Sequence, residues 1–210
     1  MIKKLFAAIA IIAAGSTPAF AQGTETEVIA RIGMKEAATY HFVEVLQTRG
    51  SWVIPDIGYI DFADNDYREI FVGVAKTLVK TKRLTVVSEL YFVQATGPEA
   101  KSARYVQPWM LVNIKFTPRL ISQTVYFPYV PINKAGRKQH VLERTKLEYV
   151  FPRFKVGAGY SAYQFGDDPW QNKPFVTVTV KDGALGDMEL WLQKMPQGVQ
   201  LQARYVRVFK

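Results

Sequence analysis

The sequence predicts an all-β fold: a closed antiparallel transmembrane β-barrel of about twelve strands, with ten strands as the alternative. Two observations predict it. Segments of about ten residues alternate apolar and polar side chains with a period of two, and an export signal precedes them. The closing segment, 199–209, alternates in this way over residues 199–205. A strand with lipid on one face and a wet lumen on the other requires this alternation.

The N-terminus has the three parts of a signal peptide. Lys3 and Lys4 form the charged start, residues 5–14 the apolar stretch, and Ala19-Phe20-Ala21 the small-x-small cleavage site. The apolar stretch is roughly half of the ~20 residues that a membrane-spanning helix needs. We therefore expect residues 1–21 to be removed and residues 22–210 to form one outer-membrane β-barrel domain.

Twelve candidate strands can be drawn, and most are near the length needed for a tilted crossing of the bilayer. An even number is typical of single-chain bacterial barrels, because both ends of the barrel then lie on the same side of the membrane. The candidates are residues 27–33, 37–47, 52–61, 67–79, 84–95, 105–117, 119–131, 142–151, 153–165, 174–182, 185–194 and 199–209.

The connections between these segments alternate in length. Counting back from the C-terminus, every second connection is tight, as at 181–184, where Asp182-Gly183 is a strong hairpin signal. The intervening connections are mostly longer and polar, with 195–198 and 63–66 as shorter exceptions. Short periplasmic turns that alternate with longer outer loops are typical of a transmembrane barrel.

Two segments leave the choice between strand and helix open. Residues 34–46 and 67–78 both carry apolar side chains at helical spacing. The second is rich in β-branched residues, which favours a strand, while the first is evenly balanced. If both were helical, the fold would move towards α+β and the barrel towards ten strands. Pro55, Pro108 and Pro128 each delete a ladder hydrogen bond, so we expect them near rims or bulges.

The sequence contains no recognisable catalytic or cofactor motif. It has no cysteine, no Gly-rich phosphate loop and no Gly-x-Ser-x-Gly nucleophile turn. Its two histidines are His41, in an apolar context, and His140, in an expected outer loop. We therefore expect neither an enzyme nor a bound cofactor or metal.

Charged residues within the strands are the candidate site. Lys or Arg costs about 2–4 kcal/mol on the lipid face at the bilayer midplane, so such side chains should point inward. They either line an open pore or neutralise one another in a plugged one, and the sequence leaves both alternatives open. The lumen candidates are Lys115, Arg153, Lys155, Arg204, Glu89 and Glu189.

A second group of charges forms an outer basic loop. It is either a solvated loop that faces anionic lipopolysaccharide or an electrostatic funnel for acidic solutes. Its members are Lys134, Arg137, Lys138, His140 and Arg144.

The chain carries a formal net charge of +9, which falls to +7 once Lys3 and Lys4 are removed with the signal peptide. This basic balance suggests acidic partners, namely lipopolysaccharide or anionic small solutes. Because the chain carries an export signal, we expect no nucleic-acid partner. If the barrel conducts, the sequence predicts that it prefers anions.

The signal peptide, the alternating strands and the terminal stretch 204–209 resemble small porin-like outer-membrane proteins of Gram-negative bacteria. The architecture is similar to that of the twelve-stranded porins for acidic oligosaccharides. The resemblance implies insertion by the barrel-assembly machinery, contact with outer-membrane lipid and a passive channel for small, anionic solutes. Lys210 departs from the usual pattern, because such proteins end on the aromatic residue itself. The other hypotheses are a closed structural or surface-interaction barrel and a soluble periplasmic β-rich binding protein.

We predict that the mature protein begins at Gln22 and fractionates with the outer membrane. Mass spectrometry of the purified protein's N-terminus and sucrose-gradient fractionation of cell envelopes measure the two properties. Recovery in the soluble periplasmic fraction would contradict the barrel interpretation.

Overall fold

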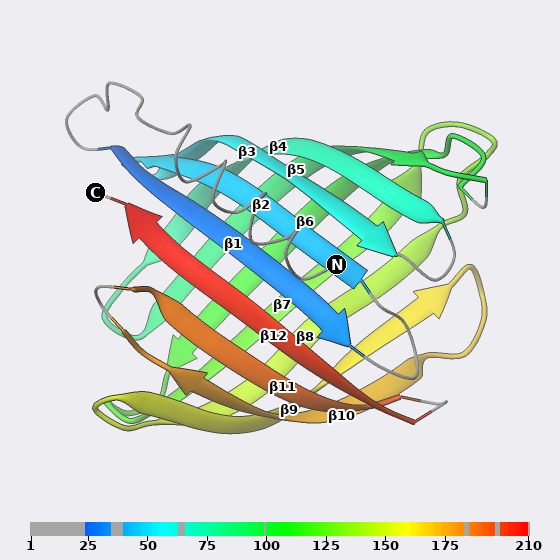
Figure 1. Ribbon diagram of the computed structural model, residues 1–210. Helices are drawn as coiled ribbons and strands as arrows, with labels where there is room; N and C mark the ends of the chain where they lie inside the picture. Colours follow the sequence, from blue (N-terminus) through cyan, green and yellow to red (C-terminus); the bar gives the residue numbers. More distant parts are fainter. Residues whose placement is uncertain are drawn as a thin grey trace.

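Twelve antiparallel strands close into one barrel in the computed structural model, which describes residues 24–34, 40–62, 66–98, 100–182, 185–195 and 198–209. Each strand pairs with its neighbours in sequence, and the first strand pairs with the last (Figure 1). The strands are β1 (Thr24–Met34), β2 (Tyr40–Arg49), β3 (Trp52–Phe62), β4 (Tyr67–Lys80), β5 (Leu84–Thr96), β6 (Arg104–Lys115), β7 (Leu120–Pro131), β8 (Gln139–Val150), β9 (Phe154–Phe165), β10 (Gln171–Val180), β11 (Asp187–Met195) and β12 (Gly198–Phe209). The all-β, twelve-stranded expectation is confirmed.

Both ambiguous segments are strands where the structure describes them. Residues 67–80 form β4, and residues 40–49 form β2. The helical spacing is overridden because each segment is paired along both edges with neighbouring strands. The ten-strand and α+β alternatives are therefore wrong for the described residues, none of which forms a helix long and apolar enough to cross a membrane.

Several expectations fall on residues outside the described ranges. The signal peptide at 1–21, its cleavage before Gln22 and the terminal Lys210 all lie there. So do Gly183 of the expected hairpin and parts of the connections at 63–66 and 195–198.

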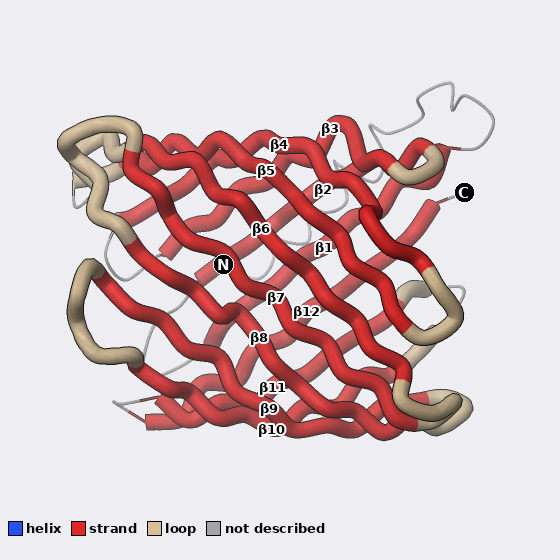
Figure 2. The backbone as a smooth tube through the Cα atoms, turned by 180° about the vertical axis from the view of Figure 1, so that it is seen from behind, coloured by secondary structure: helices blue, strands red, loops and turns tan. Residues whose placement is uncertain are grey.

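The barrel has two distinct ends. We call the end at which β1 begins and β12 finishes the terminal end, and the opposite one the loop end (Figure 1). Four connections at the terminal end have two to four residues, and the fifth, 181–186, has six. Three connections at the loop end, 97–103, 132–138 and 166–170, have five to seven residues and form the larger loops in Figure 2. The expected alternation is present in most connections, but the one expected to be a tight turn at 181–184 spans 181–186, and the loop-end connections 63–66 and 196–197 have four and two residues.

Two of the terminal-end turns use the same side-chain cap. The Thr81 hydroxyl accepts hydrogen bonds from the backbone N–H groups of Arg83 and Leu84 at 3.2 and 2.9 Å. Thr117 repeats this arrangement in the turn between β6 and β7. A threonine that satisfies the N–H groups two and three residues on stabilises a tight turn locally.

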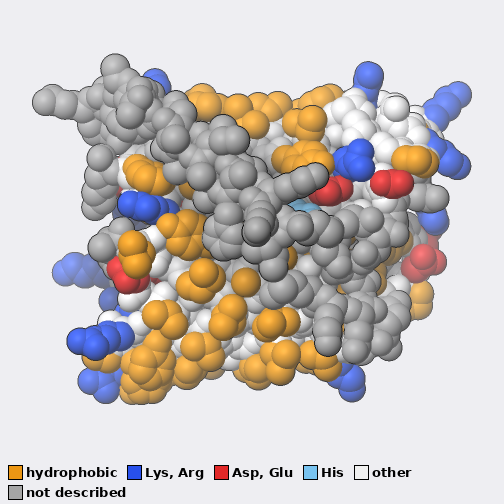
Figure 3. All heavy atoms as spheres, viewed as in Figure 1, with side chains coloured by type: hydrophobic (Ala, Val, Ile, Leu, Met, Phe, Trp, Pro, Cys, Tyr) orange, Lys and Arg blue, Asp and Glu red, His pale blue; other side chains and the backbone are white. Residues whose placement is uncertain are grey.

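The outer wall of the barrel is apolar. Large hydrophobic side chains at alternate positions remain about half exposed, as at Leu90 (52%), Met110 (47%) and Val176 (54%). Figure 3 shows such side chains over the middle of the visible wall, with most of the charged ones towards the two ends. Monomeric soluble proteins rarely expose a continuous apolar surface of this size, whereas lipid would cover it. The soluble binding-protein hypothesis loses its support here.

The internal prolines coincide with irregular pairing. The register of β6 and β7 runs through Val106↔Val130 and resumes at Met110↔Tyr126, and Pro108 and Pro128 stand opposite each other in the gap. Because proline donates no backbone hydrogen bond, one interruption accommodates both residues. Pro55 lies where the β3–β4 register shifts between Val53 and Asp56.

One β-bulge changes what faces the lumen. In β8 the pairing with β9 shifts between Leu142 and Thr145, so that Glu143 and Arg144 occupy the space of one residue. A bulge lets two successive side chains point to the same face, and both of these side chains line the lumen. The Ser161 hydroxyl donates a hydrogen bond to the Glu143 backbone carbonyl at this point.

The alternation of faces in β6 can be tested at adjacent positions. Val112 lies on the side of Met110 and Ile114, which are exposed on the outer wall, whereas Asn113 lines the lumen. We predict that Val112→Arg impairs insertion, since Arg in the lipid-facing band costs about 2–4 kcal/mol near the midplane. Asn113→Arg should insert normally. Heat-modifiable gel mobility measures the insertion of both variants. Equal tolerance of the two changes would contradict the assigned facing.

Candidate functional site

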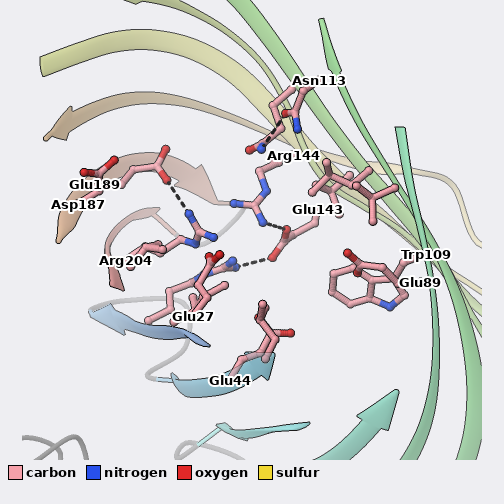
Figure 4. Close-up of a pocket in the computed structure, with 18 of the residues that line it drawn as sticks. Glu27, Glu44, Glu89, Trp109, Asn113, Glu143, Arg144, Asp187, Glu189 and Arg204 are labelled. Carbon is pink, nitrogen blue, oxygen red and sulfur yellow. Dashed lines mark hydrogen bonds and ion pairs between the residues drawn. The ribbon is translucent and has the colours of Figure 1, made fainter. Parts of the chain in front are cut away.

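A polar cavity of about 550 Å³ lies inside the barrel. All twelve strands contribute to its wall, from Glu27 on β1 to Arg204 and Val206 on β12. Its lining residues come from the middle of the strands and from their halves nearer the terminal end. Figure 4 shows the charged side chains from several strands converging on this space.

The loop half of the lumen is filled. An aromatic and alanine-rich cluster, which we call the aromatic cluster, occupies it on the β2–β7 side, and Val93 and Ala95 within it are fully buried. The Trp109 and Phe127 rings stack at the edge of this cluster, with centroids 3.8 Å apart and planes 3° apart. Its buried members are Ile29, Tyr40, Phe42, Phe71, Tyr91, Val93, Ala95, Ala100, Ala103 and Tyr105.

Inward-facing glycines make room for these rings. A Cβ at Gly58 would stand 2.0 Å from the Phe71 ring, and one at Gly73 would stand 2.3 Å from the Tyr91 ring. Each aromatic side chain therefore lies over a glycine of the preceding strand. This arrangement packs large rings inside a barrel of only twelve strands.

Glutamines fill the other side of the loop half. The Tyr40 hydroxyl donates a hydrogen bond to Gln202 Oε1 at 2.6 Å, and Gln202 Nε2 donates to Gln193 Oε1 at 2.6 Å. Gln193 and Gln202 are both buried. These buried side chains occupy the lumen between β1, β2, β11 and β12.

An ion pair spans the lumen. Arg31 Nη1 on β1 lies 2.6 Å from Glu143 Oε1 on β8, and these strands stand five and seven places apart around the ring. Arg144 Nη2 lies 2.6 Å from the other oxygen of the same carboxylate. One glutamate therefore neutralises two guanidinium groups, and Figure 4 shows its contact with Arg144.

A second pair crosses β9 and β10. Lys146 Nζ on β8 lies 2.5 Å from Glu189 Oε1 on β11 and 3.1 Å from Glu148 Oε1. Between these strands the inward positions of β9 include Gly157 and Gly159, whose added Cβ atoms would stand 2.7 to 2.8 Å from side-chain atoms of Glu148 and Lys146. The glycines therefore leave the space through which Lys146 reaches Glu189.

The remaining two basic groups of the cavity contact the same carboxylates at longer range. Arg204 Nη1 lies 3.7 Å from Glu189 Oε2, and Lys155 Nζ lies 3.9 Å from Glu148 Oε1. All five basic side chains of the described lining thus have carboxylate partners, namely Glu143, Glu148 and Glu189.

Carboxylates outnumber basic groups in the described lining by eight to five. Four of them, which we call the acidic wall, lie together on β1, β2, β3 and β5 and form no ion pair within the described part of the chain. Glu44 and Asp56 are 7% and 2% exposed. The acidic wall consists of Glu27, Glu44, Asp56 and Glu89.

The structure distributes the lumen candidates unevenly. Lys155, Arg204, Glu89 and Glu189 line the cavity. Lys115 is exposed at the terminal end of β6, outside the cavity lining. Arg153 is also exposed, because β9 begins one residue later, and Arg153 belongs to the turn. The inward placement expected of Arg153 is therefore corrected.

The outer basic loop also divides. Lys134, Arg137 and Lys138 are exposed in the connection between β7 and β8 at the loop end. Arg144, expected there, lies instead inside the barrel at 5% exposure, because β8 begins at Gln139 and places it on the same inward face as Lys146.

His140 lies in β8 and not in a loop. Its Nδ1 is 2.7 Å from the Tyr126 hydroxyl, and its ring is tilted against that of Trp170. The three rings form an aromatic group near the loop end, the placement typical of a membrane-interface belt.

Arg31, Glu44 and Asp56 belong to the site but were not predicted from the sequence. Their strands mix apolar and charged residues on the inward face, as with Phe42, Glu44 and Leu46, so the polar face gave no clear signal. One pattern could have identified them. When one face of a strand is apolar, a charged residue on the opposite face must point into the lumen.

The ion pair across the lumen predicts a stability effect. Glu143→Gln leaves Arg31 and Arg144 buried without a full counter-charge, so we expect a loss of about 3–5 kcal/mol in unfolding free energy, measured by urea unfolding in liposomes. Asp187→Asn, which removes a cavity carboxylate that forms no ion pair among the described residues, is the matched control. An equal effect of the two substitutions would show that the pair is not stabilising.

Comparisons with known proteins show which solved structures have a similar fold. No protein-family model matches the chain, and no curated protein matches it in sequence. A solved structure titled "KdgM porin" is similar with a TM-score of 0.60 and 11% identity, covering 88% of this chain and 98% of that one. "NanC porin structure in rhombohedral crystal form" gives 0.61 and 12%, covering 88% and 99%. The chain therefore has the fold of these two porins.

Proposed function

We propose that the protein is a passive outer-membrane channel for small polar solutes, exported by a cleaved signal peptide. The observation that carries the proposal is the charged cavity to which all twelve strands contribute. A barrel that served only as a membrane-embedded scaffold could fill this space with apolar side chains. The apolar outer wall and the likeness to porins support the same function.

The aromatic cluster sets the size of the solutes. Trp109 and Phe127 stack face to face where the cavity gives way to the filled loop half. A solute that crosses the barrel must pass these rings, so the channel is narrow and its conductance small.

We expect the charges of the lining, and not the net charge of the chain, to set the charge preference of the channel. The anion preference predicted from the sequence is supported by the net charge of +9 and by Lys155 and Arg204 in the lining. The excess of carboxylates in the lining supports the opposite sign. A neighbouring structure is titled "KdgM porin in complex with disordered oligogalacturonate", at 9% identity, a TM-score of 0.61 and coverage of 89% of this chain and 98% of that one. Its acidic ligand does not carry over at this identity.

A closed barrel is the second candidate, and the burial of the aromatic cluster inside the lumen favours it. In that case the protein acts through its surface. The exposed Lys134, Arg137 and Lys138 at the loop end would then contact the phosphates of lipopolysaccharide.

Single-channel recording in planar bilayers tests the proposal. We expect wild-type protein to give small, steady conductance, and the double variant Trp109→Ala, Phe127→Ala to give a larger one because two rings leave the constriction. Trp170→Ala with Phe92→Ala, which removes the same ring types from exposed positions, is the control and should conduct like wild type. Absence of current from both wild type and the Trp109→Ala, Phe127→Ala double variant would refute the channel and favour the closed barrel.

A further inference from the structure

A groove of about 520 Å³ lies on the outer face of the barrel, over the neighbouring strands β10, β11, β12 and β1 (Figure 1). Its lining residues on β12 are Ala203, Tyr205 and Arg207, and they alternate with Arg204 and Val206, which line the lumen. The groove is therefore on the lipid-facing side of the wall, separate from the polar cavity. Its volume is in the range of sites that bind small ligands, about 300–1,000 Å³.

Small residues and one turn shape this groove. Ala30 on β1 and Ala203 on β12 belong to its lining, and their single methyl groups leave depth between larger side chains. The turn 181–186 borders the groove, and the Tyr205 hydroxyl donates a hydrogen bond to the Leu185 backbone carbonyl. Gly186 lies so close to β12 that an added Cβ would stand 2.5 Å from the Val206 carbonyl oxygen. The longest turn of the terminal end is therefore held against β12.

The polar and apolar parts of the lining are separated along the barrel. Arg207 lies two residues before the end of β12, and Asp182 lies in the turn after β10, so both are at the terminal end. Ile32 and Ala203 are register partners nearer the middle of their strands. A lipid in the adjoining leaflet has the same arrangement, with its charged head at the membrane surface and its acyl chains towards the midplane.

The two charged residues of the described lining have opposite signs. Arg207 forms no ion pair within the described part of the chain, and its guanidinium lies 4.8 Å from the centre of the Phe209 ring. Asp182 Oδ1 accepts a hydrogen bond from the Leu185 backbone N–H at 2.9 Å, and a carboxylate accepts more than one. A guanidinium binds phosphate oxygens through charge-assisted hydrogen bonds, and a carboxylate binds an ammonium group in the same way.

The terminal end also has the features of a membrane interface. Basic groups there lie beside outward-facing aromatic rings. Lys76 Nζ is 4.7 Å from the centre of the Trp52 ring, and Arg119 Nη1 is 3.4 Å from the Tyr149 hydroxyl. Trp and Tyr are enriched at membrane–water interfaces, and basic side chains near a membrane surface attract lipid phosphates. The charged end of the groove therefore lies at the level of the lipid head groups.

We propose that this groove binds one phospholipid whose head group carries a phosphate and a primary ammonium group. The phosphate contacts Arg207, the ammonium contacts Asp182, and one acyl chain lies over Ala203 and Ala30. The inference requires the barrel to lie in a membrane, but it does not require an open pore.

Native mass spectrometry of the delipidated protein, released from an uncharged detergent, tests the proposal. The probes are phosphatidylethanolamine, phosphatidylcholine and phosphatidylglycerol with the same acyl chains. We expect phosphatidylethanolamine to bind most tightly, at one molecule per barrel, because choline has no N–H donor and glycerol has no positive charge. Arg207→Gln should weaken this binding about 5-fold, or about 1 kcal/mol. Ala203→Trp fills the groove without changing the charge and should abolish the binding.

Arg119→Gln and Ala158→Trp are the matched controls. Arg119 is exposed in a terminal-end turn, and Ala158 is exposed on the outer wall of β9, both outside the described lining of the groove. Both variants should bind phosphatidylethanolamine like wild type. Heat-modifiable gel mobility confirms that each variant is folded before the measurement.

Three outcomes would overturn the proposal. The first is binding without a preference for phosphatidylethanolamine, and the second is wild-type binding by Ala203→Trp. The third is a wild-type dimer or larger assembly that Ala203→Trp dissociates, because a second copy of the chain would then occupy the groove. A conducting barrel without the lipid preference fails this inference alone, whereas specific lipid binding to a barrel that does not conduct fails the proposed channel alone.

Discussion

The structure depends on one constraint of a membrane barrel: each strand has two faces, and the face in contact with lipid accepts only apolar side chains. Every charged residue in the middle of a strand must therefore point inward. In a barrel of twelve strands the interior is narrow, so charges from distant strands come within contact distance. Arg31 and Glu143 are 112 positions apart in sequence and lie 2.6 Å apart across the lumen. The ion-pair network is a consequence of this constraint, and so is the cavity that it surrounds.

The same constraint explains the glycines and the filled loop half. Large rings fit inside the barrel only where the wall beneath them has no side chain, as at Gly58 under Phe71. Gly159 likewise keeps space on the wall that Lys146 crosses to reach Glu189. Small and large inward residues thus divide the lumen into an aromatic half and a charged half. This division lets a porin-like barrel combine a narrow constriction with a roomy polar cavity.

The strands were predictable because alternation is a local property. Residues 67–79 were expected and Tyr67–Lys80 form β4, even though their apolar spacing also suits a helix. The inward facing of Lys155 and Arg204 followed from the same alternation. Arg144 was assigned to the outer basic loop, but β8 begins at Gln139, so Arg144 lies within the strand on the face of Lys146, and the bulge adds Glu143 to that face. Arg153 shows the other limit, since a strand that begins one residue later leaves a charge in the turn.

The cross-lumen partners could not be predicted, because nothing local links a residue on β1 to one on β8. The division of the cavity lining into basic residues that all have carboxylate partners and an acidic wall without ion pairs among the described residues could not be predicted either. The net charge of the chain is +9, while the described lining carries eight carboxylates against five basic groups. Much of the excess positive charge therefore lies outside the cavity, as Lys115, Lys134 and Arg153 illustrate. The total charge of a barrel is a poor guide to the field inside it.

The most direct test of this account is the reversal potential of single channels across a salt gradient. The account predicts cation preference at about 0.15 M salt, where the screening length is roughly 8 Å. The preference should shrink near 1 M salt, where the screening length is about 3 Å. Neutralising the acidic wall by Glu44→Gln and Glu89→Gln should reduce it at low salt. A wild-type channel that prefers anions would contradict this expectation. It would show that basic residues outside the cavity set the ion selectivity.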